Sequence, residues 1–511
     1  MPADLRLSYK KLLERNKDIL VLGSAATIVN WDMETMMPPK AVELRSEQLS
    51  LLSKILHKMS TAPAFGNLLD EVLRHPKCET LTEIEKRNVY LIKKSYEEQT
   101  KLPTKLVAAI AKQQTISINT WKRAKAQKNY ALYKPELEKL VSLNKQAANI
   151  LMKVKQSRTP YDALIDIYEP KINAQAIAEI FSKLQIGLRK LLAKTQAGTQ
   201  PDMSELQQPV AVEKQRQIAK LLMQTLGYET QPSTNAGGRL DETEHPFTTG
   251  YYDDVRITTH YHQDNFASSV FSVLHETGHA LYEQGLPQDW KYQPVGTACS
   301  MGVHESQSRL YENVIGRSKE FWTSLLPKMK TAAAPSLSNL QIEKFIRAVN
   351  AVKPSKIRIE ADEVTYNLHI IVRFEMEKDI FADKIKVSEL PEVWNQKYKD
   401  SLGVTVENDS EGVMQDTHWA SGLYGYFPTY ALGNIYTGQI IDSLQKENAT
   451  WRSELAQSNL AIVRKWLVRN IYNQGNLYDP VDLVKKATGT KLTVRPFLEY
   501  LTMKYSELYS F

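Results

Sequence analysis

Two histidines and a glutamate lie within five residues of one another in this 511-residue chain, in the segment His275-Glu276-Thr277-Gly278-His279. On a helix, His275 and His279 project from the same face, so their imidazoles can bind one Zn²⁺. Glu276 lies beside the first imidazole and can accept a proton from a water that the metal activates. The spacing therefore indicates a hydrolytic metal centre carried by a helix.

The sequence around this motif favours a helix. Phe271, Leu274 and Leu281 form an apolar stripe at helical spacing, and Gly285 supplies a stop signal. Eight of the 10 histidines lie between positions 245 and 418, whereas purely structural histidines would be scattered. The alternative is an ordinary amphipathic helix with two partly exposed histidines, and the clustering argues against it.

A catalytic zinc needs a third protein ligand, which must come from another element. Glu305 lies thirty residues after His275, enough for a helix end, a loop and the start of a second helix. Glu312 is two helical turns further on the same face, where it can orient a ligand histidine. A solvated carboxylate is the alternative for Glu305. His304 is a rival ligand, although on a helix it points away from its neighbour.

The residues before the metal helix alternate between apolar and polar side chains. This pattern predicts a strand over Asp254–Tyr261, with Val255 and Ile257 toward the core and Arg256 and Thr258 on the other face. We expect a small sheet beside the metal helix and an edge strand along the cleft, where a peptide can add as a further strand. A surface hairpin with an Asp–Arg pair is the alternative.

Helical periodicity dominates the rest of the chain, and no linker or fixed repeat divides it. We therefore predict a mostly α fold that forms one large helical domain over residues 1–511. Apolar residues recur at helical spacing after Asn173, a candidate helix cap, and in the segments 42–59, 83–98, 212–226, 305–330, 340–352 and 358–377.

Composition excludes several classes of protein. The formal charge of +7 comes from 65 basic and 58 acidic residues that are interleaved, which fits a solvated surface better than a nucleic-acid surface. Cys78 and Cys299 give no disulfide framework, which suits a reducing compartment. No signal peptide or membrane-spanning run is visible. We expect a cytoplasmic protein without nucleic-acid or membrane partners.

Six short segments, in order along the chain, resemble the motifs of one peptidase family. The M32 metallocarboxypeptidases, or thermostable carboxypeptidases, carry H-P-F, D-x-R-x-T, H-E-x-x-H, H-E-S/G-Q, I-R-x-x-A-D and G-x-x-Q-D-x-H-W. The matching segments are His245-Pro246-Phe247, Asp254 to Thr258, His275 to His279, His304-Glu305-Ser306-Gln307, Ile357 to Asp362, and Gly412 to Trp419.

This resemblance implies a fold, an activity and a metal site. It implies a helical domain with a deep active-site cleft, over which the helices of about residues 1–130 are expected to form a lid, and a homodimer. The expected reaction releases single residues from the free C-terminus of peptides, with broad specificity. The resemblance makes Glu305 the third ligand beside His275 and His279. One divalent ion per chain is expected: Zn²⁺ is favoured, and Co²⁺ and Mn²⁺ are the alternatives.

Hydrolysis also needs a general base and donors for the oxyanion. We assign the base to Glu276. His418 and one of Tyr424, Tyr426 and Tyr430 are the candidate donors, and we favour Tyr430.

A carboxypeptidase must also bind a free carboxylate, which a buried arginine does best. Arg358 is our choice, with Asp362 as its neighbour in the same motif; a purely structural Arg358–Asp362 salt bridge is the alternative. Arg256 is the second candidate, although Asp254 is placed to pair with it, so that the two brace the site. His245 is expected to contact substrate or line the cleft, with helix capping or packing as the alternative.

Three other functions remain open at this point. An oligo-endopeptidase would share the metal site but would not need an arginine that reads a terminal carboxylate. A protein with a purely structural metal would not need Glu276 and usually has four protein ligands. A basic nucleic-acid-binding protein would show steeply salt-dependent binding.

Overall fold

Helices make up most of the computed structural model, which describes residues 4–231, 233 and 235–511. The helix α8 (Ala174–Ala197) shows why. The side chain of Asn173 accepts a hydrogen bond from the amide of Ala176, as its predicted capping role requires. Most of the apolar residues that follow at helical spacing are buried, Ile180 is partly buried, and the prediction of a mostly α fold is confirmed. The buried residues are Ile177, Phe181, Leu184, Leu188, Leu191 and Leu192.

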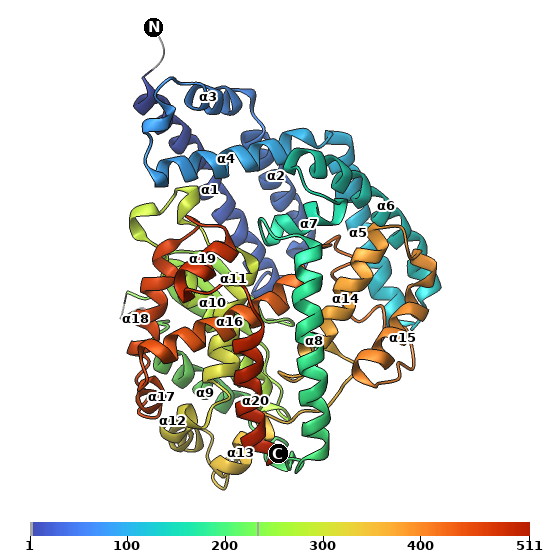
Figure 1. The fold of residues 1–511 in the computed structure, drawn as a ribbon, viewed down its shortest axis with the longest axis vertical. Coiled ribbons are helices and arrows are strands. Elements are labelled where there is room, and N and C mark those ends of the chain that lie inside the picture. Colours follow the sequence, from blue (N-terminus) through green and yellow to red (C-terminus); the bar gives the residue numbers. More distant parts are fainter. Residues whose placement is uncertain (1–3, 232, 234) are drawn as a thin grey trace.

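The first helices lie together at the end of the molecule where the chain begins (Figure 1). Helices α1, α3 and α4 share a small hydrophobic core that is separate from the main core. Helix α2 packs along α1 and has no buried residue. These helices and their neighbours are α1 (Leu5–Thr35), α2 (Val42–Ser60), α3 (Pro63–Leu73), α4 (Glu83–Lys101), α5 (Thr104–Ala126), α6 (Tyr130–Lys155) and α7 (Pro160–Tyr168).

The three strands among the described residues form one small sheet beside α10. The predicted strand is present as β3, but it is the central strand rather than an edge. It pairs with β1 in parallel and with β2 in antiparallel fashion. Of the two edge strands, β2 lies beside α10, where Thr248 hydrogen-bonds Glu276. Thr258, predicted to face outward, is buried because β3 is covered on both faces, and its hydroxyl hydrogen-bonds the backbone of Phe247. The elements are α9 (Val212–Leu226), β1 (Gly238–Glu242), β2 (Thr248–Tyr251), β3 (Asp254–Thr259) and α10 (Phe266–Gln284).

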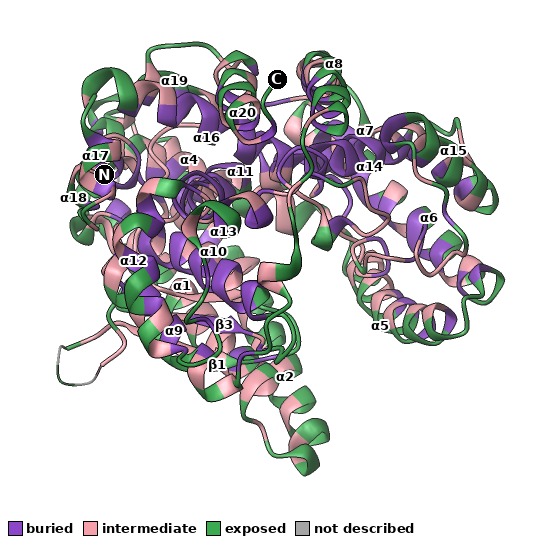
Figure 2. Ribbon diagram, turned by 90° about the horizontal axis from the view of Figure 1, so that it is seen from below, coloured by how far each residue is buried: buried purple, intermediate pink, exposed green. Residues whose placement is uncertain are grey.

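The remaining helices build most of the core around α10. Figure 2 shows that α10, α11, α14 and α16 are largely buried. No helix in the described part of the chain is long and apolar enough to span a membrane. These helices are α11 (Met301–Arg309), a π-helical turn (Leu310–Ile315), α12 (Lys319–Ala332), α13 (Ile342–Val349), α14 (Tyr366–Phe381), α15 (Leu390–Leu402), α16 (Pro428–Glu447), α17 (Trp451–Leu455), α18 (Ala461–Asn470), α19 (Pro480–Thr488) and α20 (Arg495–Tyr509).

Two glycines allow α11 to pack closely between α10 and α16. A Cβ at Gly278 of α10 would lie 2.7 Å from the carbonyl oxygen of Gln307 and from the Cα of Ser308. A Cβ at Gly433 of α16 would lie 2.8 Å from the Cβ of Glu305. A larger residue at either position would push α11 away. These close approaches set the position of Glu305 relative to the histidines of α10.

The segment 358–377 is not the continuous helix that its periodicity predicts. Arg358 lies in a short 3₁₀ turn, and α14 begins only at Tyr366. The carboxylate of Asp362 accepts hydrogen bonds from the amides of Val364 and Thr365, which stabilises the turn before the helix. Arg358 and Asp362 therefore do not share a helix face, and the proposed structural salt bridge between them does not form.

Candidate metal centre and cleft

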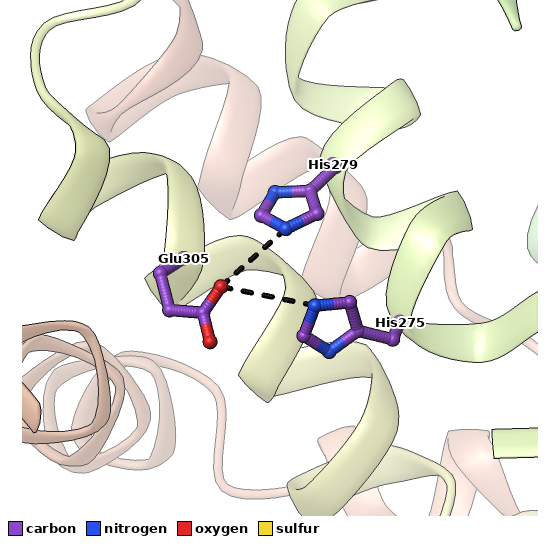
Figure 3. A group of neighbouring side chains, drawn as sticks. All are labelled: His275, His279 and Glu305. Atoms are coloured by element: carbon purple, nitrogen blue, oxygen red, sulfur yellow. Dashed lines mark ion pairs between the residues drawn. The ribbon is translucent and has the colours of Figure 1, made fainter. Parts of the chain in front are cut away.

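The three predicted ligands converge between α10 and α11 (Figure 3). Oε2 of Glu305 lies 3.7 Å from Nε2 of His275 and 3.4 Å from Nε2 of His279. One ligand atom from each residue lies within 4.8 Å of the others. Two nitrogens and a carboxylate oxygen, all pointing at one place, are a donor set that suits a divalent ion such as Zn²⁺.

Glu312 orients the first imidazole. Its Oε2 lies 2.8 Å from Nδ1 of His275, so Nδ1 carries the proton and Nε2 is free to bind a metal. Burial opposes the charged form of His275, but the carboxylates of Glu305 and Glu312 outweigh burial and raise its pKa. Glu312 is also held by Arg317, whose Nη2 lies 3.3 Å from Oε1.

His304 lies behind the second imidazole. Its Nδ1 is 2.5 Å from Nδ1 of His279, and its Nε2 is 2.9 Å from Oε1 of Glu283. If Glu283 accepts the proton of Nε2, the free Nδ1 of His304 accepts from His279, whose Nε2 then faces Glu305. Burial lowers the pKa of His279 to about 3, so the ring is neutral as a ligand must be. His304 therefore contacts a predicted ligand from behind, and Glu283 is a partner that spacing did not reveal.

Glu276 points into the cleft beside these donors. The residue is 7 % exposed, and its carboxylate accepts a hydrogen bond of 2.6 Å from the hydroxyl of Thr248 on β2. The same hydroxyl contacts the carbonyl oxygen of Glu276 at 3.0 Å. Burial raises the pKa of Glu276, as is useful for a group that must take up a proton. Sequence reasoning missed Thr248, because it lies on a separate strand.

A cavity of about 830 Å³ opens onto this centre. Its walls combine groups from the metal helices with residues of distant segments, including α4 and the edge strand β2. The walls include Arg87, Tyr90, Lys94, Phe247, Thr248, Tyr251, Met301, Tyr426 and Tyr430, together with His275, Glu276, His279 and Glu305.

Of the three candidate tyrosines, Tyr426 and Tyr430 line this cavity. Tyr424 is 1 % exposed, and its hydroxyl faces the carbonyl oxygen of Trp419. His418 lies behind Tyr430, with Nε2 at 3.2 Å from the tyrosine hydroxyl. Burial lowers the pKa of His418 to about 3, so its ring is neutral. Tyr430 thus lines the cavity, whereas His418 lies behind it.

Arg358 lies one layer behind the cavity wall, 6 % exposed. Its Nε and Nη2 both donate to Oδ1 of Asp416, and its Nη1 donates to the hydroxyl of Tyr366 at 3.0 Å. The guanidinium lies 5.2 Å from the centre of the Tyr430 ring. Arg373 also pairs with Asp416, so this carboxylate has two cationic partners.

The other predicted residues lie further away. Arg256 donates two hydrogen bonds, of 2.7 and 2.9 Å, to the carboxylate of Asp254. Its guanidinium stacks 4.3 Å from the ring centre of Trp31 on α1, so the pair joins the sheet to the N-terminal helices. His245 is exposed, and only its neighbours Pro246 and Phe247 line the cavity.

A helix-borne pair of imidazoles, a carboxylate from a second helix and a buried glutamate beside them define the class of metal-dependent hydrolases. The family model of the Carboxypeptidase Taq (M32) metallopeptidases matches residues 11–505. The chain belongs to this family and is a metallocarboxypeptidase. The predicted family and enzyme class are thus confirmed.

Relatives match over almost the whole chain. Thermostable carboxypeptidase 1 of Thermus thermophilus is 39 % identical over 98 % of this chain and 99 % of its own length. Carboxypeptidase 1 of Bacillus subtilis is 37 % identical over 98 % of each chain. The M32 carboxypeptidase structure from Deinococcus radiodurans superposes with a TM-score of 0.94 at 33 % identity, covering 99 % of this chain and 100 % of that one.

Proposed function

We propose that this enzyme is a zinc-type carboxypeptidase of broad specificity that hydrolyses the last peptide bond of peptides with a free C-terminus. The observation that carries the proposal is the convergence of His275, His279 and Glu305, with Glu276 beside them in a cleft. These three residues would hold the ion, with Co²⁺ and Mn²⁺ as alternatives to Zn²⁺. When bound, such an ion acidifies a water and polarises the scissile carbonyl.

The protein groups move the protons. Glu276 takes the proton of the attacking water and passes it to the leaving amine, while Thr248 fixes the orientation of its carboxylate. Tyr430 is the donor proposed for the oxyanion, since it lines the cavity and His418 contacts its hydroxyl from behind.

Arg358 is proposed to bind the terminal carboxylate. It is the buried arginine nearest to Tyr430, and Asp416 fixes its plane. Because Arg358 lies behind the ring of Tyr430, the terminal carboxylate of a bound peptide must pass that ring to reach the guanidinium. Asp362 supports this role indirectly, by shaping the turn that carries Arg358. The pair of Arg256 and Asp254 is proposed to brace the sheet.

The test compares two peptides of one sequence, both N-acetylated, one with a free C-terminus and one amidated. The metal-loaded enzyme is incubated with each and the products are read by mass spectrometry, with Glu276→Gln as the control. A ladder that loses one residue at a time from the free-acid peptide alone is expected. Internal fragments from both peptides would instead indicate an endopeptidase, and no cleavage with Zn²⁺, Co²⁺ or Mn²⁺ would contradict the proposal.

Three further proposals concern the whole protein. The helices of about residues 1–130 are proposed to act as a lid, because α4 lines the cavity while α1, α3 and α4 have a core of their own.

A homodimer is proposed, because Leu44 and Leu51 of α2 are 61 % and 58 % exposed on a helix with no buried residue. Light scattering of wild type and Leu51→Glu tests the dimer. A cytoplasmic location is proposed from the two free cysteines, Cys78 and Cys299.

A further inference from the structure

Arg309 contacts the predicted carboxylate ligand from the side opposite the imidazoles. It is the last residue of α11, and its side chain is 12 % exposed. Its Nε donates to Oε1 of Glu305 at 2.6 Å. The other oxygen, Oε2, is the one that faces His275 and His279. The two oxygens of Glu305 therefore have different partners.

The hydroxyl of Ser308 leaves Oε2 of Glu305 open. It lies 2.8 Å from the backbone carbonyl oxygen of Glu305 and 3.1 Å from Oε2, and a hydroxyl has only one proton to donate. The charged guanidinium of Arg309 holds Oε1 at 2.6 Å, whereas Oε2 faces both imidazoles. Glu305 is therefore arranged to offer Oε2 to a metal.

The same guanidinium reaches the partner of another ligand. Nη1 of Arg309 lies 3.2 Å from Oε2 of Glu312, the oxygen that accepts the hydrogen bond from His275. The π-helical turn that begins directly after Arg309 belongs to a class of local distortion that is common at functional sites. Arg309 thus contacts both the carboxylate of Glu305 and the carboxylate of Glu312, which orients the imidazole of His275.

Arg309 is itself held in one orientation. Its guanidinium lies over the ring of Tyr366, 4.3 Å from the centroid, and the hydroxyl of Tyr366 accepts from Arg358. Stacking suits a planar guanidinium and not the compact ammonium of lysine. The contacts of Arg309 therefore depend on the planar shape of its guanidinium as well as on its charge.

We propose that Arg309 is a positioning residue that holds Glu305 as a one-oxygen ligand and ties it to the Glu312–His275 pair. The inference rests on the proposed metal site. A plain alternative is that Arg309 only neutralises two buried carboxylates. Lysine separates the two roles, because it keeps the charge and loses the fork and the stack.

The experiment uses the full chain as wild type, Arg309→Lys and Arg309→Met, with Arg317→Lys as the matched control. Arg317 contacts Glu312 and makes no hydrogen bond to Glu305. Zn²⁺ affinity is measured by competition with a chelator, and the Co²⁺-loaded proteins are compared by visible absorption and X-ray absorption. Both Arg309 variants are expected to lose about 10–100-fold in affinity and to show an extra oxygen ligand. The control keeps a charge beside Glu312 and leaves the Arg309–Glu305 contact intact, so it is expected to gain no extra oxygen ligand.

The outcomes separate this inference from the metal site itself. If wild type binds no ion, or if His275→Ala does not weaken binding, the site and the inference both fail. If wild type binds one ion through His275 and Arg309→Lys keeps the wild-type affinity and spectrum, the inference alone fails, since charge then suffices. Arg309→Lys decides the question even if Arg309→Met does not fold.

Discussion

At the scale of single residues, the site depends on which nitrogen of each imidazole is left free. Nδ1 of His275 is engaged by Glu312, and Nδ1 of His279 by His304, so both Nε2 atoms face Glu305. Neither contact binds a metal, yet each selects a tautomer and a ring orientation. The partners of the proposed ligands therefore shape the centre as much as the proposed ligands do.

Replacing Glu276 by Gln should separate chemistry from metal binding. The variant keeps the shape of the side chain but cannot accept a proton, so kcat should fall by about 10²–10⁴-fold. Metal content should not change, because Glu276 is adjacent to the proposed ligands and is not one of them. Steady-state kinetics on a free-acid peptide and metal analysis of the same samples check this. A variant that loses both activity and metal would mean that Glu276 shapes the site instead.

Replacing Arg358 by Met should remove the recognition of the terminal carboxylate. We expect kcat/KM on free-acid peptides to fall by about 10²-fold, the value of a lost charged hydrogen bond. The fold should survive, because Arg373 remains as a partner for Asp416. Arg87→Met is the control, since Arg87 lines the cleft directly and pairs with Asp479. A larger loss in the Arg87 variant would transfer the role to Arg87.

At the scale of elements, the distance between α10 and α11 sets the geometry of the three proposed ligands. His275 and His279 come from α10, and Glu305 comes from α11. The two helices meet at Gly278, directly before His279, where side-chain atoms would not fit. The glycine inside the motif therefore has a packing role, separate from metal binding.

Gly278→Ala should force the two helices apart. A Cβ would lie 2.7 Å from backbone atoms, which cannot move as a side chain can, so we expect a loss of about 1–3 kcal/mol in stability and weaker metal binding. Gly23→Ala is the matched control, because it lies inside α1 with nothing within 4 Å and should gain up to about 1 kcal/mol. Urea denaturation and chelator competition measure the two effects. If the Gly278→Ala and Gly23→Ala variants are equally stable, α11 can shift to accommodate the added Cβ at little cost in free energy.

The parts of the site that depend on residues close together in the sequence could be predicted. The metal helix follows from residues four apart, and the strand Asp254–Thr259 from alternation. The partners Thr248 and Glu283 and the π-helical turn were not predictable, because they depend on how separate elements approach one another. The helix predicted over 358–377 was wrong at its start, since Asp362 satisfies backbone amides in a turn that periodicity cannot reveal.

At the scale of the whole molecule, buried carboxylates join distant parts of the chain. Glu169, fully buried after α7, accepts hydrogen bonds from the amide of Gly302 on α11 and from the hydroxyl of Tyr436 on α16, at 2.9 and 2.7 Å. Glu377 similarly accepts from Trp419 and from the amide of Gly425. Each holds a segment that carries site residues, and no cation directly pairs with either carboxylate in the described part of the chain.

Glu169 should make the stability of the enzyme depend on pH. Burial raises its pKa from 4.5 to about 7, so the folded state binds this proton more tightly than the unfolded state. Stability should therefore fall as pH rises between about 4.5 and 7 and level off above, by on the order of 3 kcal/mol from this group. Glu169→Gln stays neutral, and its amide can donate to Tyr436 while its oxygen still accepts from Gly302. Relative to wild type, the variant should gain stability between pH 5 and pH 8 in urea denaturation. If the stability of the two proteins changes in parallel between pH 5 and pH 8, Glu169 is charged at both pH values and its hydrogen bonds alone stabilise that charge.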